Sequence, residues 1–216
     1  MHKTPWPTKA VMEQIYEQKL WGGKEFDFFS GLGSYEVEIV NPYLDAVLLF
    51  LKSFKKPLIL CDLGCGDFNI GKQLACHTKE YYAIDIAENV ITRNKKIFKE
   101  NNVQFFCLDI ASDDLPNGDC AIVRQVLQHL SNAEISIIVK KLYAFKYVIL
   151  TEHVPKDSFL PNIDIISGQG IRLKKNSGVN VLASPFNLRV KKEELLSTVF
   201  LEGNKGKIVT TLYTIF

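Results

Sequence analysis

The sequence of 216 residues contains no apolar run close to the ~20 residues that a membrane-spanning helix needs. Its opening stretch also lacks the apolar centre of a secretory signal peptide, so a cytoplasmic location is expected. No Pro/Gly-rich linker, low-complexity tract or internal repeat divides the chain. These absences disfavour membrane, fibrous and repeat proteins, and they predict one folded domain over residues 1–216.

Cysteine is scarce, with five residues and no Cys-x-x-Cys pair. Disulfide frameworks use an even number of cysteines and zinc sites usually contain such pairs, so we expect neither and predict no metal site. An excess of one charge is also missing, because 26 basic and 24 acidic residues leave a net charge of +2. The lysines lie in scattered doublets, which are typical of solvated surfaces. A small-molecule partner is therefore favoured over nucleic acid or a membrane.

From residue 58 onward, short apolar runs alternate with helical patterns. Wholly apolar runs of this length are typical of strands buried on both faces of a parallel sheet. The last helical pattern begins with Ser131 and Glu134, which have the spacing of a capping box. The alternation predicts an α/β fold with right-handed crossovers and helices on both faces. The expected strands lie near 58–61, 81–84, 103–106, 120–123 and 147–150, and the expected helices near 70–76, 88–99 and 133–145.

Two segments lie outside this alternation. Residues 1–54 form a predicted helical lead-in, with one helix capped by Thr8 and another over 39–54. Residues 155–187 form an insertion after the fifth strand, in which the turn-forming residues 176–178 indicate a hairpin. Long excursions of this kind often carry function.

The end of the sequence predicts how the sheet is completed. Residues 191–197 have a helical pattern, whereas 199–201 and 208–216 are strand-like on either side of a turn. A terminal hairpin can enter the sheet only if its last strand reverses direction. We therefore predict a three-layer sandwich with a seven-stranded, mostly parallel sheet of order 3-2-1-4-5-7-6, in which the last strand is antiparallel.

The first predicted strand ends in the motif Asp62-Leu63-Gly64-Cys65-Gly66. Glycines at such a turn let the backbone approach a ligand closely, and the helix that follows offers free amides. A dinucleotide-binding fingerprint would require glycine at position 69, where this chain has Asn69. The motif thus indicates a nucleotide-like ligand other than NAD.

This motif resembles the first motif of the class I, Rossmann-like S-adenosylmethionine-dependent methyltransferases, and the likeness extends over roughly residues 58–150. The third glycine of many members is Phe68 here. The resemblance implies that the chain binds S-adenosylmethionine, transfers its methyl group to an acceptor by in-line displacement and releases S-adenosylhomocysteine.

The resemblance also implies cofactor contacts at the ends of three strands. Asp62 would meet the methionine ammonium, directly or through water, and Asp109 the adenine amino group. Asp85 lies ~20 residues after the glycine turn, the spacing of an acid that accepts hydrogen bonds from ribose hydroxyls. Any one of these acids is commonly only a cap, but three together favour a site. The predicted cofactor-binding residues are Asp62, Gly64, Cys65, Gly66, Asn69, Asp85, Ile86, Asp109, Ile110 and Gln125.

Candidate catalytic residues follow the fourth and fifth strands. His129 and Glu152 are the possible general bases, although a histidine between leucines is more often a packed residue. Tyr16 and Trp21 of the lead-in either cover the sulfonium, whose charge favours aromatic faces, or simply pack the first helices. The sequence lacks the Pro-Pro-aromatic and Pro-Cys signatures of methyltransferases that act on nucleobases. A small-molecule acceptor is therefore expected.

Two alternatives remain open from the sequence. The chain is also compatible with a non-catalytic S-adenosylmethionine-binding or interaction protein, because no catalytic residue is certain. An NAD(P)-dependent oxidoreductase on a related fold is disfavoured by Asn69 and by the missing serine-tyrosine-lysine catalytic set.

Overall fold

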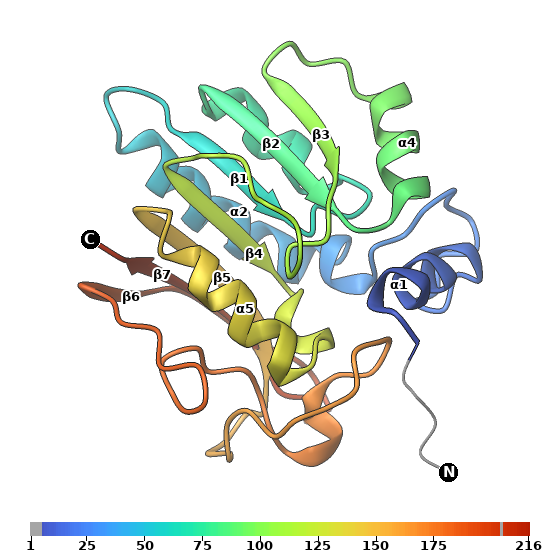
Figure 1. Ribbon diagram of the computed structural model, residues 1–216, viewed down its shortest axis with the longest axis vertical. Helices are drawn as coiled ribbons and strands as arrows, with labels where there is room; N and C mark the ends of the chain where they lie inside the picture. The colour runs from blue at the N-terminus through green and yellow to red at the C-terminus, as the bar shows by residue number, and fades with distance from the viewer. Residues whose placement is uncertain (1–5, 204) are drawn as a thin grey trace.

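Seven strands form one sheet in the computed structural model, which describes residues 6–203 and 205–216 (Figure 1). The strand order is β3-β2-β1-β4-β5-β7-β6, and β7 runs antiparallel to both of its neighbours. The predicted topology is therefore confirmed. The absence of a signal peptide was predicted from the opening stretch of the sequence, whose first five residues lie outside the described part of the chain. The strands are β1 (Ile59–Leu63), β2 (Glu80–Asp85), β3 (Val103–Cys107), β4 (Cys120–Arg124), β5 (Tyr147–Val154), β6 (Lys192–Phe200) and β7 (Lys207–Thr214).

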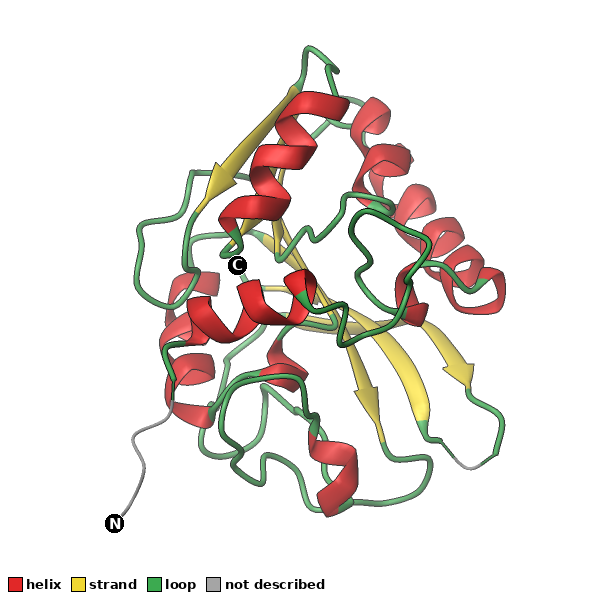
Figure 2. Ribbon diagram, turned by 90° about the vertical axis from the view of Figure 1, so that its right-hand side faces the viewer, coloured by secondary structure: helices red, strands yellow, loops and turns green. Residues whose placement is uncertain are grey.

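Helices cover both faces of the sheet (Figure 2). Helix α2 lies behind the sheet and α5 in front of it in Figure 1, which makes three layers. The α-helices are α1 (Thr8–Glu17), α2 (Val37–Lys52), α3 (Gly71–Leu74), α4 (Glu88–Ile97) and α5 (Asn132–Leu142). Short 3-10 helices are η1 (Leu32–Ser34), η2 (Ala75–His77), η3 (Leu127–His129) and η4 (Arg172–Lys175). No helix in the described part of the chain is long and apolar enough to cross a membrane.

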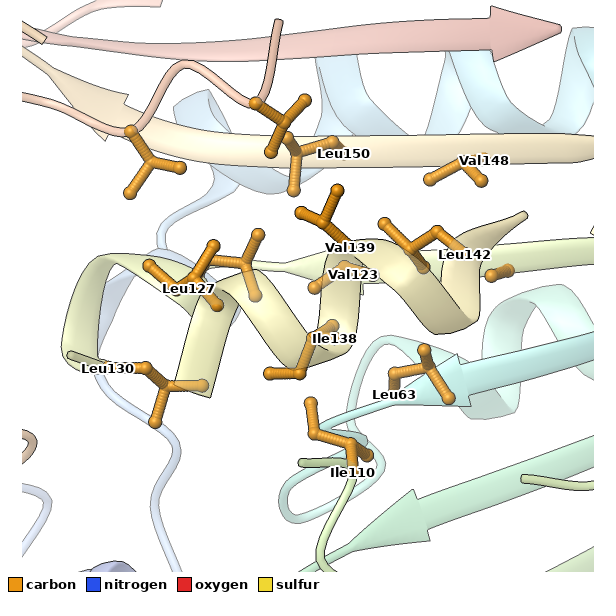
Figure 3. Close-up of a cluster of buried hydrophobic side chains, with 14 of the residues drawn as sticks. Leu63, Ile110, Val123, Leu127, Leu130, Ile138, Val139, Leu142, Val148 and Leu150 are labelled. Carbon is orange, nitrogen blue, oxygen red and sulfur yellow. The ribbon is translucent and has the colours of Figure 1, made fainter. Parts of the chain in front are cut away.

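The core divides into two large apolar clusters, one on each side of the sheet. On the α5 side, Ile138, Val139 and Leu142 pack against β-strand residues that include Val123 and Val148 (Figure 3). Each such buried side chain contributes about 1.5–3 kcal/mol relative to an exposed one. This packing holds α5 against the face of β4 and β5.

The helix caps agree only in part with the sequence. At α5 the capping box is confirmed, because Ser131 Oγ accepts from the Glu134 amide and the Glu134 carboxylate accepts from the Ser131 amide. Thr8 does not cap α1, and Pro7 occupies that position. The Thr8 hydroxyl instead donates to Glu134 Oε1 at 2.5 Å. The Thr8 hydroxyl therefore bonds to a residue distant in the chain and does not cap the first turn of α1.

Two predictions for the last third of the chain were wrong. Residues 191–197 are not helical, because β6 spans Lys192–Phe200 and pairs along its length with β7. The ladder hydrogen bonds of a sheet edge outweigh the weak local helical pattern. The insertion 155–187 contains no hairpin; it is irregular apart from η4, whose Arg172 side chain is buried. A buried guanidinium needs hydrogen-bond acceptors, and the irregular backbone of the insertion places Arg172 among carbonyl groups that supply them.

Candidate functional site

A cavity of about 360 Å³ lies at the carboxyl ends of the central parallel strands. Ligands of open α/β sheets bind at this edge. The lead-in and the insertion border the same cavity, because residues 30–34 and Ile171 line it together with the strand ends. Of the predicted cofactor-binding residues, the structure brings Asp62, Gly64, Cys65, Gly66, Asp85, Ile86, Asp109, Ile110 and Gln125 together in its wall.

The turn after β1 requires its glycines. Gly64 and Gly66 have φ of 95° and 54°, in the left-handed region that side chains rarely adopt. A Cβ on Gly64 would lie 2.3 Å from Val126 Cγ2, and one on Gly66 would lie 2.3 Å from Ser30 Oγ. Phe68, at the third motif position, also has a positive φ of 64°, and its ring is completely buried. The turn therefore keeps its shape without a third glycine.

Asp85 ends β2 and holds the glycine turn. Its Oδ2 accepts from the Gly66 amide and its Oδ1 from the Ala87 amide, both at 2.9 Å. Burial raises the pKa of this carboxyl, and the two amides oppose the shift. Each carboxylate oxygen has a second lone pair, so Asp85 can accept hydrogen bonds from further donors.

Asp62 near the end of β1 and Asp109 just after β3 have different environments. Asp62 is buried and accepts a 2.7 Å hydrogen bond from the Tyr81 hydroxyl, and burial raises its pKa to about 6. Asp109 Oδ1 accepts from the Ala111 amide at 2.8 Å, next to the apolar side chain of Ile110. Both carboxylates line the cavity.

Asn69 does not line the cavity with the other predicted residues. Its side-chain amide donates to the Ser34 carbonyl at 2.7 Å, which ties the turn to the lead-in. Asp67, two residues earlier, has a similar role, because its Oδ2 accepts from the Ser30 amide and the Tyr35 hydroxyl. The geometry thus gives Asn69 a contact within the chain in place of a ligand contact.

His129 lies in the cavity wall with both ring nitrogens engaged. Its Nδ1 is 3.1 Å from the Gly168 carbonyl, which can only accept, so Nδ1 carries the proton. Its Nε2 then accepts from Gln128 Nε2 at 3.3 Å. Burial lowers the pKa of His129 to about 4, and the ring lies 5.3 Å from that of Trp21. His129 is therefore a neutral side chain in the cavity wall, and it has little capacity to accept a proton.

Glu152 does not line the cavity. Its side chain is buried on β5, and neither carboxyl oxygen has a hydrogen-bond partner among the described residues. Burial raises the pKa of Glu152 to about 8 despite the nearby Arg172. At neutral pH this carboxyl is therefore mostly protonated, which does not suit a general base.

Arg124 and Tyr43 line the cavity but were not among the predicted site residues. Arg124, the last residue of β4, donates from Nη2 to the Gly33 carbonyl at 2.5 Å and from Nη1 to Ser34 Oγ at 3.3 Å. Its guanidinium carbon lies 4.7 Å from the centre of the Tyr43 ring. The sequence did contain a signal for Arg124, because a charged residue at the end of an apolar strand is a candidate for ligand binding. No signal marked Tyr43, because its position fits the apolar face of α2.

Residues 61–145 match the family model described as a methyltransferase domain. Phosphoethanolamine N-methyltransferase 1 of Arabidopsis thaliana is 30% identical over 101 residues, and its namesake of Zea mays is 30% identical over 116 residues. These matches cover 44% and 51% of this chain but 20% and 23% of those proteins. The chain thus spans about a fifth of the curated relatives it matches.

Solved structures share the whole fold. The N-methyltransferase NodS from Bradyrhizobium japonicum WM9, in complex with S-adenosylhomocysteine, superposes with a TM-score of 0.68 at 10% identity, covering 94% of this chain and 98% of NodS. Magnesium protoporphyrin IX methyltransferase from Synechocystis PCC 6803, with bound S-adenosylmethionine, gives 0.60 at 17% identity, covering 98% and 99%. The superpositions show that this chain shares the Rossmann-like fold and strand order of these structures, and residues 61–145 are similar to a methyltransferase domain.

Proposed function

We propose that this chain binds S-adenosylmethionine in the cavity and transfers its methyl group to a small-molecule acceptor, releasing S-adenosylhomocysteine. The observation that carries the proposal is the convergence of Asp62, Asp85 and Asp109 with the Gly64–Gly66 turn in one cavity wall. Three carboxylates near three strand ends match the hydrogen-bond donors of a nucleoside that carries an amino acid, namely its ammonium, its ribose hydroxyls and its adenine amino group. The family match at 61–145 covers the same segment.

The residues present fit the cofactor group by group. The buried carboxyl of Asp62 would meet the ammonium, and an ammonium nearby would favour its ionised form. Asp85 would accept from the ribose hydroxyls with its free lone pairs. Asp109 would accept from the adenine amino group, while Ile86 and Ile110 would pack against the ring. Bound S-adenosylmethionine supplies an electrophilic methyl group on a positively charged sulfur.

The contribution of the chain to the reaction is positioning. Holding two reactants in line lowers the activation free energy by roughly 7–11 kcal/mol. The transfer needs no general base when the nucleophile is an amine or a thiolate. Trp21 and His129 form a closely packed aromatic wall beside the strand ends. We propose that they exclude water and direct the acceptor, and we assign a proton-accepting role to neither His129 nor Glu152.

The acceptor is proposed to lie between the lead-in around residues 21–35 and the insertion over 161–187. The insertion contacts the lead-in beside the cavity, because Gln169, which lines it, donates from Nε2 to the carbonyl of Leu20 at 2.8 Å, next to Trp21. The turns after the first three strands are occupied by the proposed cofactor contacts. We propose that residues 1–216 form one domain. We also propose a cytoplasmic location, with which the five free cysteine thiols are consistent.

Binding and turnover test the proposal separately. Calorimetry should detect S-adenosylhomocysteine binding and no binding of NAD at the same concentration. Incubation with radiolabelled S-adenosylmethionine and a panel of small amines, thiols and phenols should then transfer label to at least one class. Binding without any transfer would favour the non-catalytic alternative, and tighter binding of NAD would overturn the cofactor assignment.

A further inference from the structure

Arg124 is a partly buried cationic side chain at the cavity wall, where Asp62 and Asp67 attract it without forming an ion pair. Within the described residues, no ion pair joins its guanidinium to an acid, and its Nε is buried without a hydrogen-bond partner. Burial lowers the pKa of Arg124, which reports the cost of keeping this charge away from water. Charges held away from water are normally paired, so a guanidinium that has no ion pair in the described part of the chain and lies in a cavity wall indicates an anionic ligand.

Two further buried polar atoms near Arg124 also have no partner. These are the Tyr43 hydroxyl and Gln125 Nε2. Tyr43 lies against the guanidinium, and Gly33 contacts both of the other residues: its carbonyl accepts from Arg124, and a Cβ on it would lie 2.5 Å from Gln125 Nε2. All three side chains line the cavity. They form a cluster of potential hydrogen-bond donors with too few acceptors.

Arg172 shows what a saturated buried arginine looks like in the same protein. Its three nitrogens donate to the carbonyls of Ile163, Leu127, Gln128 and Leu130 and to Asn132 Oδ1, at 2.7–3.4 Å. That side chain is fully engaged by the chain itself. Arg124 has only two acceptors, both from the lead-in.

The sheet register places Arg124 beside the acid proposed to meet an ammonium. Asp62 of β1 pairs with Ile122 of β4, and Arg124 lies two residues further along on the same face. An α-amino acid carries an ammonium and a carboxylate on one carbon, so an acid and an arginine side by side are complementary to both. Attraction between Arg124 and Asp62 opposes the effect of burial on the Asp62 pKa, in keeping with their proximity.

We infer that Arg124, with Tyr43 and Gln125, binds the α-carboxylate of the cofactor and is the residue group that selects an amino-acid-bearing nucleoside. This inference rests on the proposed function. The Arg124 bonds to Gly33 and Ser34 also connect the carboxylate site to η1 of the lead-in, which borders the same cavity.

The test compares two ligands that differ only in the carboxylate. Wild type, Arg124→Met and Arg124→Lys are titrated by calorimetry with S-adenosylhomocysteine and with its decarboxylated analogue. Wild type should bind S-adenosylhomocysteine roughly 10- to 100-fold more tightly, the scale of hydrogen bonds to a charged group. Arg124→Met should lose this preference while keeping its affinity for the analogue, and Arg124→Lys should retain part of it. Arg189→Met, an exposed arginine outside the cavity, is the control.

Each outcome decides a different point. If wild type binds both ligands equally, or Arg124→Met keeps the preference, the carboxylate assignment is wrong. If Arg124→Met weakens both ligands equally, the residue has only a structural role and the assignment is equally wrong. Should that variant not fold, the wild-type comparison and Arg124→Lys still decide the matter. Failure of wild type to bind S-adenosylhomocysteine at all would overturn the proposed function itself.

Discussion

At the scale of single residues, Asp85 combines a structural and a proposed ligand-binding task. Its carboxylate satisfies the amides of Gly66 and Ala87, so the glycine turn depends on it before a ligand binds. We expect Asp85→Ala to weaken S-adenosylhomocysteine binding by about 1.5–3 kcal/mol, and Asp85→Asn, which keeps one acceptor oxygen, to weaken it less. Calorimetry on variants shown to be folded by circular dichroism measures this. Unchanged affinity in folded Asp85→Ala would place the ribose elsewhere.

Glu152 gives a prediction for stability as a function of pH. Its pKa is raised from 4.5 to about 8 in the folded protein, so the folded state holds a proton that the unfolded state releases. The associated stability is fully present below pH 4.5 and is lost as the pH rises through 8. At ~1.4 kcal/mol per pKa unit, the loss is a few kcal/mol.

The measurement is urea unfolding of wild type and Glu152→Gln at pH 5 and pH 9. Wild type should lose more stability than the variant between the two values, because glutamine cannot ionise. Glu100→Gln, at an exposed position, should behave as wild type does. Parallel losses in wild type and Glu152→Gln would show that Glu152 is ionised or solvated in the folded state.

At the scale of elements, the insertion depends on one side chain. Arg172 joins η4 to the carbonyls around η3, which precede α5. Arg172→Met should lower the free energy of unfolding by about 3 kcal/mol or more, because several buried acceptors lose their donor. Lys174→Met, on the same short helix but exposed, should change it by no more than about 0.5 kcal/mol. Equal effects in urea unfolding would contradict this role.

The same contacts decide how the insertion is tested for acceptor binding. Replacing residues 168–178 as a block would remove Arg172 and disturb η3, so a smaller change is needed. Ile171 lines the cavity and is only partly buried. With a known acceptor, Ile171→Ala should keep S-adenosylhomocysteine affinity within about threefold while acceptor turnover falls about tenfold. Normal turnover would assign the insertion a structural role only.

At the scale of the whole molecule, ligand binding should appear as stability. A ligand that binds only the folded state at 100 times its dissociation constant adds about 2.7 kcal/mol. For a chain of this size we expect S-adenosylhomocysteine to raise the melting temperature by about 5–10 °C, and NAD at equal concentration to leave it unchanged. Differential scanning fluorimetry with both ligands measures the difference. A shift of the same size with NAD would indicate a dinucleotide site.

The sequence determined the elements whose pattern is local. The buried parallel strands, the capping box at Ser131 and the glycine turn after β1 each depend on neighbours a few residues apart, and each lies where the pattern predicted. The topology followed as well, because alternating strands and helices leave few ways to arrange a sheet. Three strand-end acids could be predicted to converge for the same reason.

Only the tertiary structure decided features that depend on partners far apart in the chain. Residues 191–197 became strand because β7 pairs with them, and Arg172 became a buried hub because carbonyls from the turn before α5 surround it. Among the described residues, Arg124 finds only two acceptors, the Gly33 carbonyl and the Ser34 hydroxyl of the lead-in, and its Nε has none. Charge balance and proton affinity follow from burial and from neighbours in space, which a local pattern does not contain.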